Sequence, residues 1–329
     1  MKGTIEFPPH LNRIRTFHQH ANTFSSMPSS ILFILASLIW GSTFWAITQQ
    51  LGTADPSVSV TYRFALSSLI LFAWCALRKN GGVKLAWKLQ PWFMLQGFLA
   101  FAVGYLCTYY SEQYVVSALV AVLFSLVVIW NPIAERIFFA KPLTWRIWGA
   151  AAMSITGILC LFSPALTDFW SHRQDTQAGL FMWGLGLALI ATIASTLGNL
   201  IVVRIRKESN DVLLGMAWAM GWGTVFDGAW SLISGASWSV PMQMNYWLSL
   251  MYLAVFGSVI AFACYFTLIH RIGAQKAVYI GVITPIISVL LSIQLENYRP
   301  GLIEWLGMVL CLAGVIFALR SPSKTSTVN

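Results

Sequence analysis

Charged side chains are scarce in this chain. Only 9% of its 329 residues are Asp, Glu, Lys or Arg, whereas 57% are hydrophobic, and its mean hydropathy is +0.70. Because soluble domains carry about 25% charged residues, this composition excludes the soluble globular class. It predicts a polytopic membrane protein whose surroundings are the lipid bilayer.

The sequence also lacks the motifs of enzymes and ATP-driven pumps. Its apolar segments contain no HExxH, no paired aspartates and no Ser/His set, and the chain has no GxxxxGK[ST] loop. The five cysteines lie inside apolar segments without CxxC or Cys/His spacing, which favours packing over metal or disulfide chemistry. We therefore expect no catalytic residues, no metal and no cofactor.

A net charge of +9 could indicate a nucleic-acid partner, but only if the basic residues gathered on one face or in one domain. Here they are spread between apolar segments, so no nucleic acid is expected and membrane orientation is the better explanation. A channel is disfavoured as well, because neither a polar pore lining nor the signature of a ringed oligomer is visible.

Apolar runs separated by polar breaks predict an all-α protein with ten transmembrane helices. The predicted ranges are 30–49, 57–77, 91–111, 115–137, 144–163, 178–203, 212–234, 246–270, 274–295 and 301–319. With the N-terminus in the cytoplasm, 17 of the 20 Lys and Arg residues fall on the inner side, and only Arg173 and Arg299 fall outside. This bias predicts that both termini are cytoplasmic and leaves Arg63 as the one basic residue well inside a span.

A weak internal repeat divides the chain. At an offset of 158 residues, 104–127 pairs with 262–285 and 138–163 pairs with 296–321. Each half then holds five helices, at 29–163 and 178–320, and an odd number forces the two copies into opposite orientations. Inverted repeats of this kind are an architecture of secondary transporters, with the substrate near the midplane. The remaining predicted parts are a polar cytoplasmic segment at 1–28, an extracytoplasmic linker at 164–177 and a cytoplasmic tail at 321–329. The segment 1–28 lacks the apolar core of a signal peptide.

Several segments carry a family resemblance. They are LIWGSTFWAI at 38–47, TYRFALSSLIL at 61–71, the long stretch at 252–296 that ends in SVLLSIQLE, and EWLGMVLCLAGVIFAL at 304–319. In this order, over about 30–320, the chain resembles the EamA-type transporters of the drug/metabolite transporter superfamily. Pro285 and Glu296 match the family pattern, whereas Val127 and Phe138 occupy the equivalent first-half positions.

The resemblance implies a secondary transporter in the bacterial inner membrane that exports or exchanges small metabolites, commonly amino acids or related amphiphiles, by alternating access. Export is the expected direction. Few fixed charges and several aromatic residues also suit a small amphiphilic substrate. Pairing with a second copy as a homodimer is compatible with this reading. The alternative is a membrane receptor or lipid-handling protein without solute flux.

Polar groups inside spans are costly and tend to face a cavity. The resulting substrate-cavity candidates are Trp40, Ser42, Arg63, Tyr109, Asn131, Asp227, Tyr265, Tyr279 and Thr284, and the candidates for kinks or gates are Gly41, Pro132 and Pro285. Gly41 fits a packing seam as well as a pocket, and transmembrane prolines often kink a helix without binding a ligand.

Arg63 and Asp227 lie at comparable predicted depths. Either they pair and neutralise each other, or each faces a wet cavity, where Arg63 could bind a substrate carboxylate and Asp227 could exchange a proton. Arg63 could also be tolerated without a function, because its long side chain can reach the interface. On either functional reading, Arg63→Ala and Asp227→Asn are expected to abolish transport.

Overall fold

The computed structural model describes residues 27–77, 87–140, 142–171, 176–206, 208, 211–239, 241–272 and 277–319. Within these ranges the regular structure is entirely helical. Two of the predicted regions lie mostly or wholly outside the described residues: the segment 1–28, of which only 27 and 28 are described, and the tail at 321–329.

The first half contributes five helical spans. They are α2 (Ser29–Thr48), α3 (Pro56–Leu77), the composite of η1 (Trp87–Leu89), α4 (Gln90–Gln96), η2 (Gly97–Val103) and α5 (Gly104–Ser111), the broken pair α6 (Ser117–Phe124) and α7 (Val127–Phe139), and α8 (Trp145–Ser171). The second half contributes α9 (Thr176–Arg206), α10 (Val212–Ile233), the composite of α11 (Met244–Met251), η3 (Tyr252–Ile260) and α12 (Ala261–Ile272), then α14 (Ile280–Leu295) and α15 (Leu302–Leu319).

Each of the ten predicted spans has a helical counterpart, which confirms the all-α fold. Eight of the described helical segments are long and apolar enough to cross a membrane, and α14 is a shorter apolar helix. The predicted linker is mostly helical, because α8 continues to Ser171 and α9 already begins at Thr176. Local chemistry sets several ends: the Asp211 side chain accepts from the Leu214 amide at 3.1 Å and caps α10, and α7 ends where Ala140 turns left-handed at a φ of 53°.

Three spans are irregular, and all three approach the centre of the bundle. Turns at 125 and 126 separate α6 from α7. The third and eighth spans each contain a π-helical segment, η2 and η3. An offset of 158 residues carries η2 onto 255–261, and six of these seven positions lie in η3. Such π-segments often accompany functional sites.

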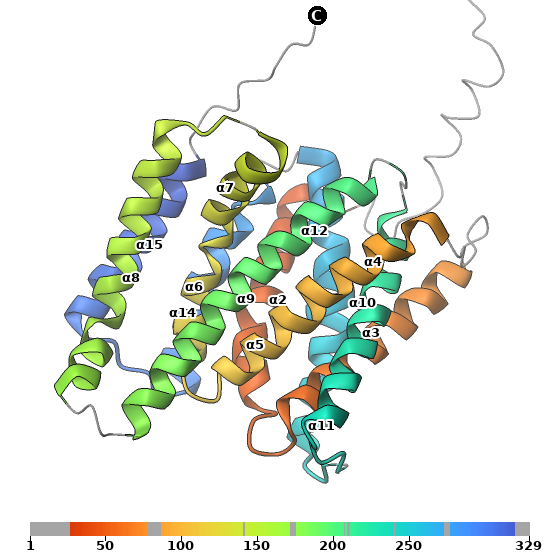
Figure 1. The fold of residues 1–329 in the computed structure, drawn as a ribbon, viewed down its shortest axis with the longest axis horizontal. Helices are drawn as coiled ribbons and strands as arrows, with labels where there is room; N and C mark the ends of the chain where they lie inside the picture. Colours follow the sequence, from red (N-terminus) through yellow and green to blue (C-terminus); the bar gives the residue numbers. More distant parts are fainter. Residues whose placement is uncertain are drawn as a thin grey trace, which may run out of the picture.

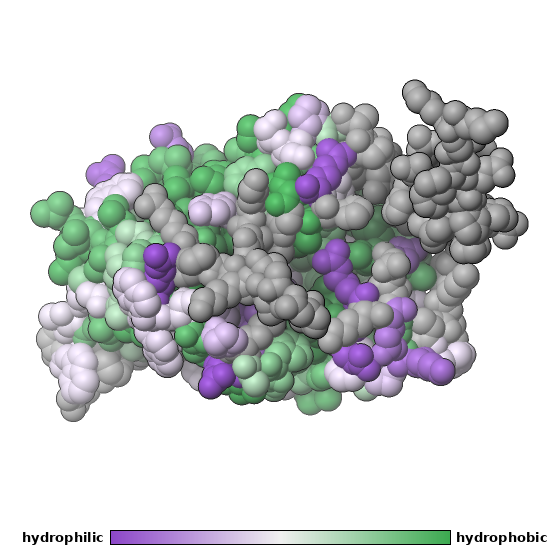
Figure 2. Space-filling view, turned by 90° about the horizontal axis from the view of Figure 1, so that it is seen from above, coloured by the Kyte–Doolittle hydropathy of each residue, from purple (hydrophilic) through white to green (hydrophobic). Residues whose placement is uncertain are grey.

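The helices pack as one bundle (Figure 1) in which α3 lies along α10, α8 along α15, α2 along α14, and α5 along α9. The described chain starts at Met27 and stops at Leu319 on the same side of the bundle, the top of Figure 1, which we call the terminal end. Figure 2 looks onto this end and shows polar side chains over its face and apolar side chains along the flanks. Large exposed apolar residues such as Leu69 and Trp148 suit flanks in contact with lipid.

Candidate functional site

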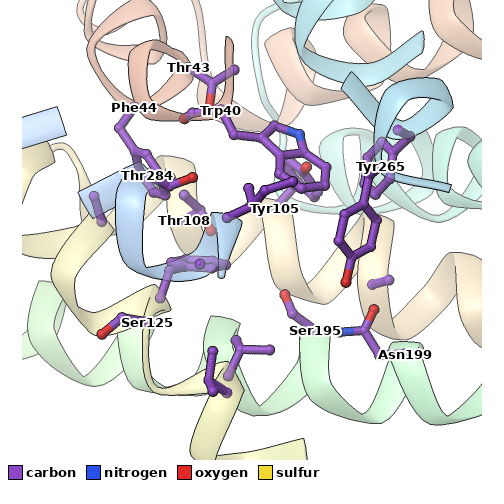
Figure 3. A pocket seen from close by; sticks show the side chains of 18 of the residues that line it. Trp40, Thr43, Phe44, Tyr105, Thr108, Ser125, Ser195, Asn199, Tyr265 and Thr284 are labelled. Atoms are coloured by element: carbon purple, nitrogen blue, oxygen red, sulfur yellow. The ribbon is translucent and has the colours of Figure 1, made fainter. Parts of the chain in front are cut away.

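A cavity of about 250 Å³ lies at the centre of the bundle. Both halves of the chain build its walls, with residues from α2, α3, α5, α6 and α7 on one side and from α9, α10, α12 and α14 on the other. Figure 3 shows this arrangement, with Trp40, Thr43 and Phe44 of α2 facing Ser195 and Asn199 of α9 and Tyr265 of α12. Its size is near the lower end of the range for small-molecule sites, about 300 to 1,000 Å³.

Six of the twelve residues predicted from the sequence line this cavity. They are Trp40, Arg63, Asn131, Tyr265, Thr284 and Pro285. Trp40 holds its place by donating from Nε1 to the Gly257 carbonyl at 3.2 Å, and its ring lies 5.2 Å from that of Tyr265. The walls are otherwise mainly apolar and aromatic, with Phe44, Phe101, Phe124 and Phe262 among them.

Two polar atoms in the wall have no hydrogen-bond partner among the described residues. They are Asn131 Oδ1, on the fourth span, and Thr284 Oγ1, on the ninth, and both are buried. The turn at Ser125 and the start of α14 also border the cavity, through Ser125 and Ile280. Irregular backbone and unpartnered polar groups of the fourth and ninth spans therefore lie at the same cavity, and the predicted sequence repeat would make these two spans equivalent.

Among the described residues that line the cavity, Arg63 is the only one with a charged side chain. It is 1% exposed, and it donates from Nε to Ser258 Oγ at 3.2 Å and from Nη1 to the Tyr109 hydroxyl at 3.5 Å. Its guanidinium carbon lies 4.7 Å from the centre of the Tyr105 ring, a cation–π contact. All of these partners are neutral, so they orient the guanidinium and leave its charge uncompensated.

The predicted pairing of Arg63 with Asp227 is absent from the described part of the chain, where the two residues share no ion pair. Asp227 is 0% exposed, and neither of its carboxylate oxygens has a hydrogen-bond partner in the part of the chain that the structure describes. It does not line the cavity either, so neither alternative drawn from the sequence describes it. The reason is rotational, because equal depth does not place two side chains on facing sides of their helices.

Five further candidates lie outside the cavity wall. Ser42 bonds the Tyr252 hydroxyl at 2.6 Å, and Tyr109 is fully buried behind Arg63. Tyr279 caps the start of α14, and Pro132 is inside α7. Gly41 is a close-packing position, since a Cβ there would lie 2.6 Å from Ile287 Cβ of α14.

Sequence reasoning missed several polar wall residues. They are Gln96, Tyr105, Thr108, Ser125, Ser195 and Asn199. Each is an uncharged residue in a largely apolar segment, so no motif marked it. Asn199 was the most detectable, because an amide inside a span is costly to bury unless it faces a polar space.

At the end of the bundle away from the termini, which we call the opposite end, hydrogen bonds join the two halves of the chain. There the Glu296 carboxylate accepts from the Ser117 hydroxyl and, at 3.2 Å, from Ser292, and so joins α6 of the first half to α14 of the second. At the terminal end a smaller hollow of about 20 Å³ shares Gln96, Val202, Met216 and Phe266 with the cavity and also includes Arg206 and Asp211. The cavity therefore approaches the surface at the terminal end.

Comparison with known proteins agrees with this architecture. The family model described as the EamA-like transporter family matches residues 27–163 and 182–320. The inner membrane transporter YedA of Escherichia coli strain K12, itself uncharacterized, is 28% identical over 282 residues, which cover 85% of this chain and 86% of YedA. Protein PagO of Salmonella typhimurium is 26% identical over 303 residues, which cover 88% of this chain and 92% of PagO.

Proteins of lower sequence identity also match most of the chain. An uncharacterized transporter of Archaeoglobus fulgidus is 25% identical over 296 residues, which cover 87% of this chain and 95% of the relative. A protein of known crystal structure, 15% identical, superposes with a TM-score of 0.62 over 88% of this chain and 96% of its own, which shows a shared fold. Because the family model spans both halves of the helical bundle, the chain belongs to the EamA-like transporter family.

Proposed function

We propose that this chain is a secondary transporter that carries a small amphiphilic metabolite, an amino acid or a related compound, across the inner membrane by alternating access, with export as its direction. The observation that carries the proposal is the central cavity, whose walls come from both halves of the chain and hold one buried, uncompensated arginine. Both termini are then cytoplasmic, and the hollow at the terminal end is the cytoplasmic approach. The same proposal leaves room for a homodimer.

Alternating access is supported by the way helix contacts repeat. If the two halves are inverted copies, the pairs α3 with α10 and α8 with α15 each join equivalent helices, and both are extensive contacts. The contact of α5 with α9 is then equivalent to that of α12 with α2, and both are present. An inverted pair can exchange the conformations of its halves, which opens the cavity to each side in turn.

The bonds at the opposite end supply a gate for such an exchange. Ser117 of the first half bonds Ser292 at 2.9 Å and also donates to Glu296, both in the second half. In the alternate state these bonds separate, and the terminal end closes over the residues that surround the smaller hollow. The described conformation is then the one that loads substrate from the cytoplasm.

The substrate chemistry follows from the wall. Arg63 offers the charge that a carboxylate requires, and a guanidinium can bind a carboxylate through two parallel hydrogen bonds. Asn131 Oδ1 and Thr284 Oγ1 offer acceptors to an N–H or O–H group of the same solute. The phenylalanine rings around them suit an apolar side chain, so aromatic and branched amino acids are the first solutes to test.

The test is counterflow in proteoliposomes that contain the purified chain. Radiolabelled phenylalanine, tryptophan and leucine are offered outside vesicles loaded with the same unlabelled compound, after metabolites excreted by cells with and without the protein have been compared. Saturable, transient accumulation supports the carrier. Binding of these compounds without counterflow, in a preparation that retains its folded helical content, would instead favour a receptor or a lipid-handling protein.

A further inference from the structure

Glu112 is a buried acid that the cavity does not use. It follows the last residue of α5 and is only 6% exposed. Both of its carboxylate oxygens are buried and lack a hydrogen-bond partner among the described residues. It differs in this from Glu296, whose carboxylate accepts from Ser117 and Ser292. An ionised carboxylate without partners is strongly disfavoured away from water.

The charges around Glu112 reinforce its burial. Burial raises the pKa of the Glu112 carboxyl well above its usual range, the charge of Glu296 raises this pKa further, and the charge of Arg63 opposes them. Tyr109, in the helix that ends just before Glu112, accepts a hydrogen bond from Arg63. The charged groups that act on Glu112 are Glu296, directly after α14, and Arg63 from α3.

We propose that Glu112 is a proton-binding site, occupied while the opposite end is closed and emptied when that end opens. The proposal rests on the proposed alternation of the two ends. In the closed state Glu112 is buried and feels the charges of Glu296 and Arg63, and opening brings water to both carboxyls. The proton then leaves Glu112 for solvent on the opposite side, and an ionised Glu112 becomes tolerable because water solvates it.

Linkage fixes the sign of the effect. Burial raises the pKa of Glu112 in the described state, and access of water in an open state would lower it again, so the closed state binds the proton more tightly. Low pH therefore favours the closed opposite end. As the pH rises through the raised pKa, that preference is lost and the end opens.

Two measurements on the full-length protein in lipid vesicles test the proposal, and neither needs a substrate. The first is infrared difference spectroscopy across a pH titration, which detects the C=O stretch of a protonated buried carboxyl. Because Asp227 is the other buried acid without a described partner, spectra are recorded in the D227N background. We expect a protonated-carboxyl band that is lost in E112Q and kept in E208Q, a surface control in which Glu208 pairs with Arg204.

The second measurement follows opening directly. Gln50 is 1% exposed in the turn after α2, at the opposite end. A cysteine placed there by Gln50→Cys is treated with a membrane-impermeant maleimide at several pH values, and labelling is counted above that of the chain with its native cysteines alone. Because the thiolate is the reactive form, labelling at each pH is divided by that of the unfolded chain at the same pH. We expect this normalised labelling to rise with pH, to become independent of pH when E112Q is added, and to regain its pH dependence with E112D.

Each outcome decides the proposal. A band that persists in E112Q, or labelling whose pH dependence survives E112Q, would overturn it. If E112Q does not fold, E112D must still move the midpoint of both curves, and an unmoved midpoint also overturns the proposal. If the chain shows the pH effect but no counterflow, the proposed carrier function is wrong and the proton site is still supported. Failure of the carrier proposal can therefore be told from failure of the proton-site proposal.

Discussion

The guanidinium of Arg63 donates to the Ser258 hydroxyl at 3.2 Å, and Ser258 in turn donates to the Leu253 carbonyl five residues earlier at 3.0 Å. The second bond is possible because both residues lie in η3, where the π-helical backbone widens the turn. A neutral hydroxyl held in this way orients the arginine toward the cavity without neutralising it. The π-helical segment η3 therefore positions the serine that orients Arg63.

Replacing Arg63 tests whether its charge binds the solute. Because a hydrogen bond to a charged group contributes about 1.5 to 3 kcal/mol, Arg63→Gln is expected to weaken the binding of a carboxylate solute by roughly ten- to hundredfold. Arg63→Lys keeps the charge but loses bidentate geometry, so it should bind with intermediate affinity. The measurement is the concentration dependence of counterflow.

The matched control for this comparison is Arg204→Gln. Arg204 pairs with Glu208 at 2.8 Å on the surface, with 45% of its side chain exposed, and such pairs contribute little. Equal loss of transport in Arg204→Gln and Arg63→Gln would assign the effect to net charge and remove Arg63 from the binding site.

Asp227 leads to a different expectation from the one that its sequence position suggested. Its carboxylate has no described partner and does not line the cavity. An amide of the same shape carries no ionic burial cost, so Asp227→Asn should retain flux and melt at an equal or higher temperature. Thermal unfolding in detergent and counterflow in vesicles measure the two quantities. Loss of flux with unchanged melting would place Asp227 in the transport cycle after all.

The contact of α8 with α15 depends on two glycines that face each other. A Cβ on Gly157 would lie 2.5 Å from the Cys311 amide, and one on Gly307 would lie 2.5 Å from the Leu161 amide. Since backbone atoms cannot turn aside, Gly157→Ala and Gly307→Ala should each destabilise the protein by about 1 to 3 kcal/mol. The control is Gly186→Ala in α9, where nothing lies within 4 Å. Melting temperatures that fall equally in all three variants would contradict this account.

The fold was predictable because apolar runs report which segments enter lipid, and all ten such runs became helices. Arg63 was predictable as a site residue for the related reason that a lone charge in an apolar run needs a polar space. Thr108, Ser195 and Asn199 could not be assigned, because the side of a helix that a residue faces depends on how that helix packs. The prediction that Asp227 pairs with Arg63 or faces the cavity does not describe this structure for the same reason. The π-segments and the break at Ser125 carry no sequence signal of their own, since they arise from packing against neighbouring helices.

Arg63 lines the cavity and its charge also acts on Glu112, which predicts that solute and proton bind together. The positive charge of Arg63 lowers the pKa of Glu112, although burial and Glu296 outweigh it. A carboxylate bound at Arg63 neutralises that charge, so it raises the pKa of Glu112 and favours proton uptake. By reciprocity a proton on Glu112 strengthens solute binding, and the affinity for a carboxylate solute should fall as pH rises.

Binding isotherms for labelled phenylalanine at several pH values measure this dependence. In E112Q, where no proton can leave, the affinity should no longer change with pH, and in Arg63→Gln the solute should no longer alter the infrared band of Glu112. An affinity that falls with pH to the same extent in the wild-type protein and in E112Q would show that the linked proton resides elsewhere.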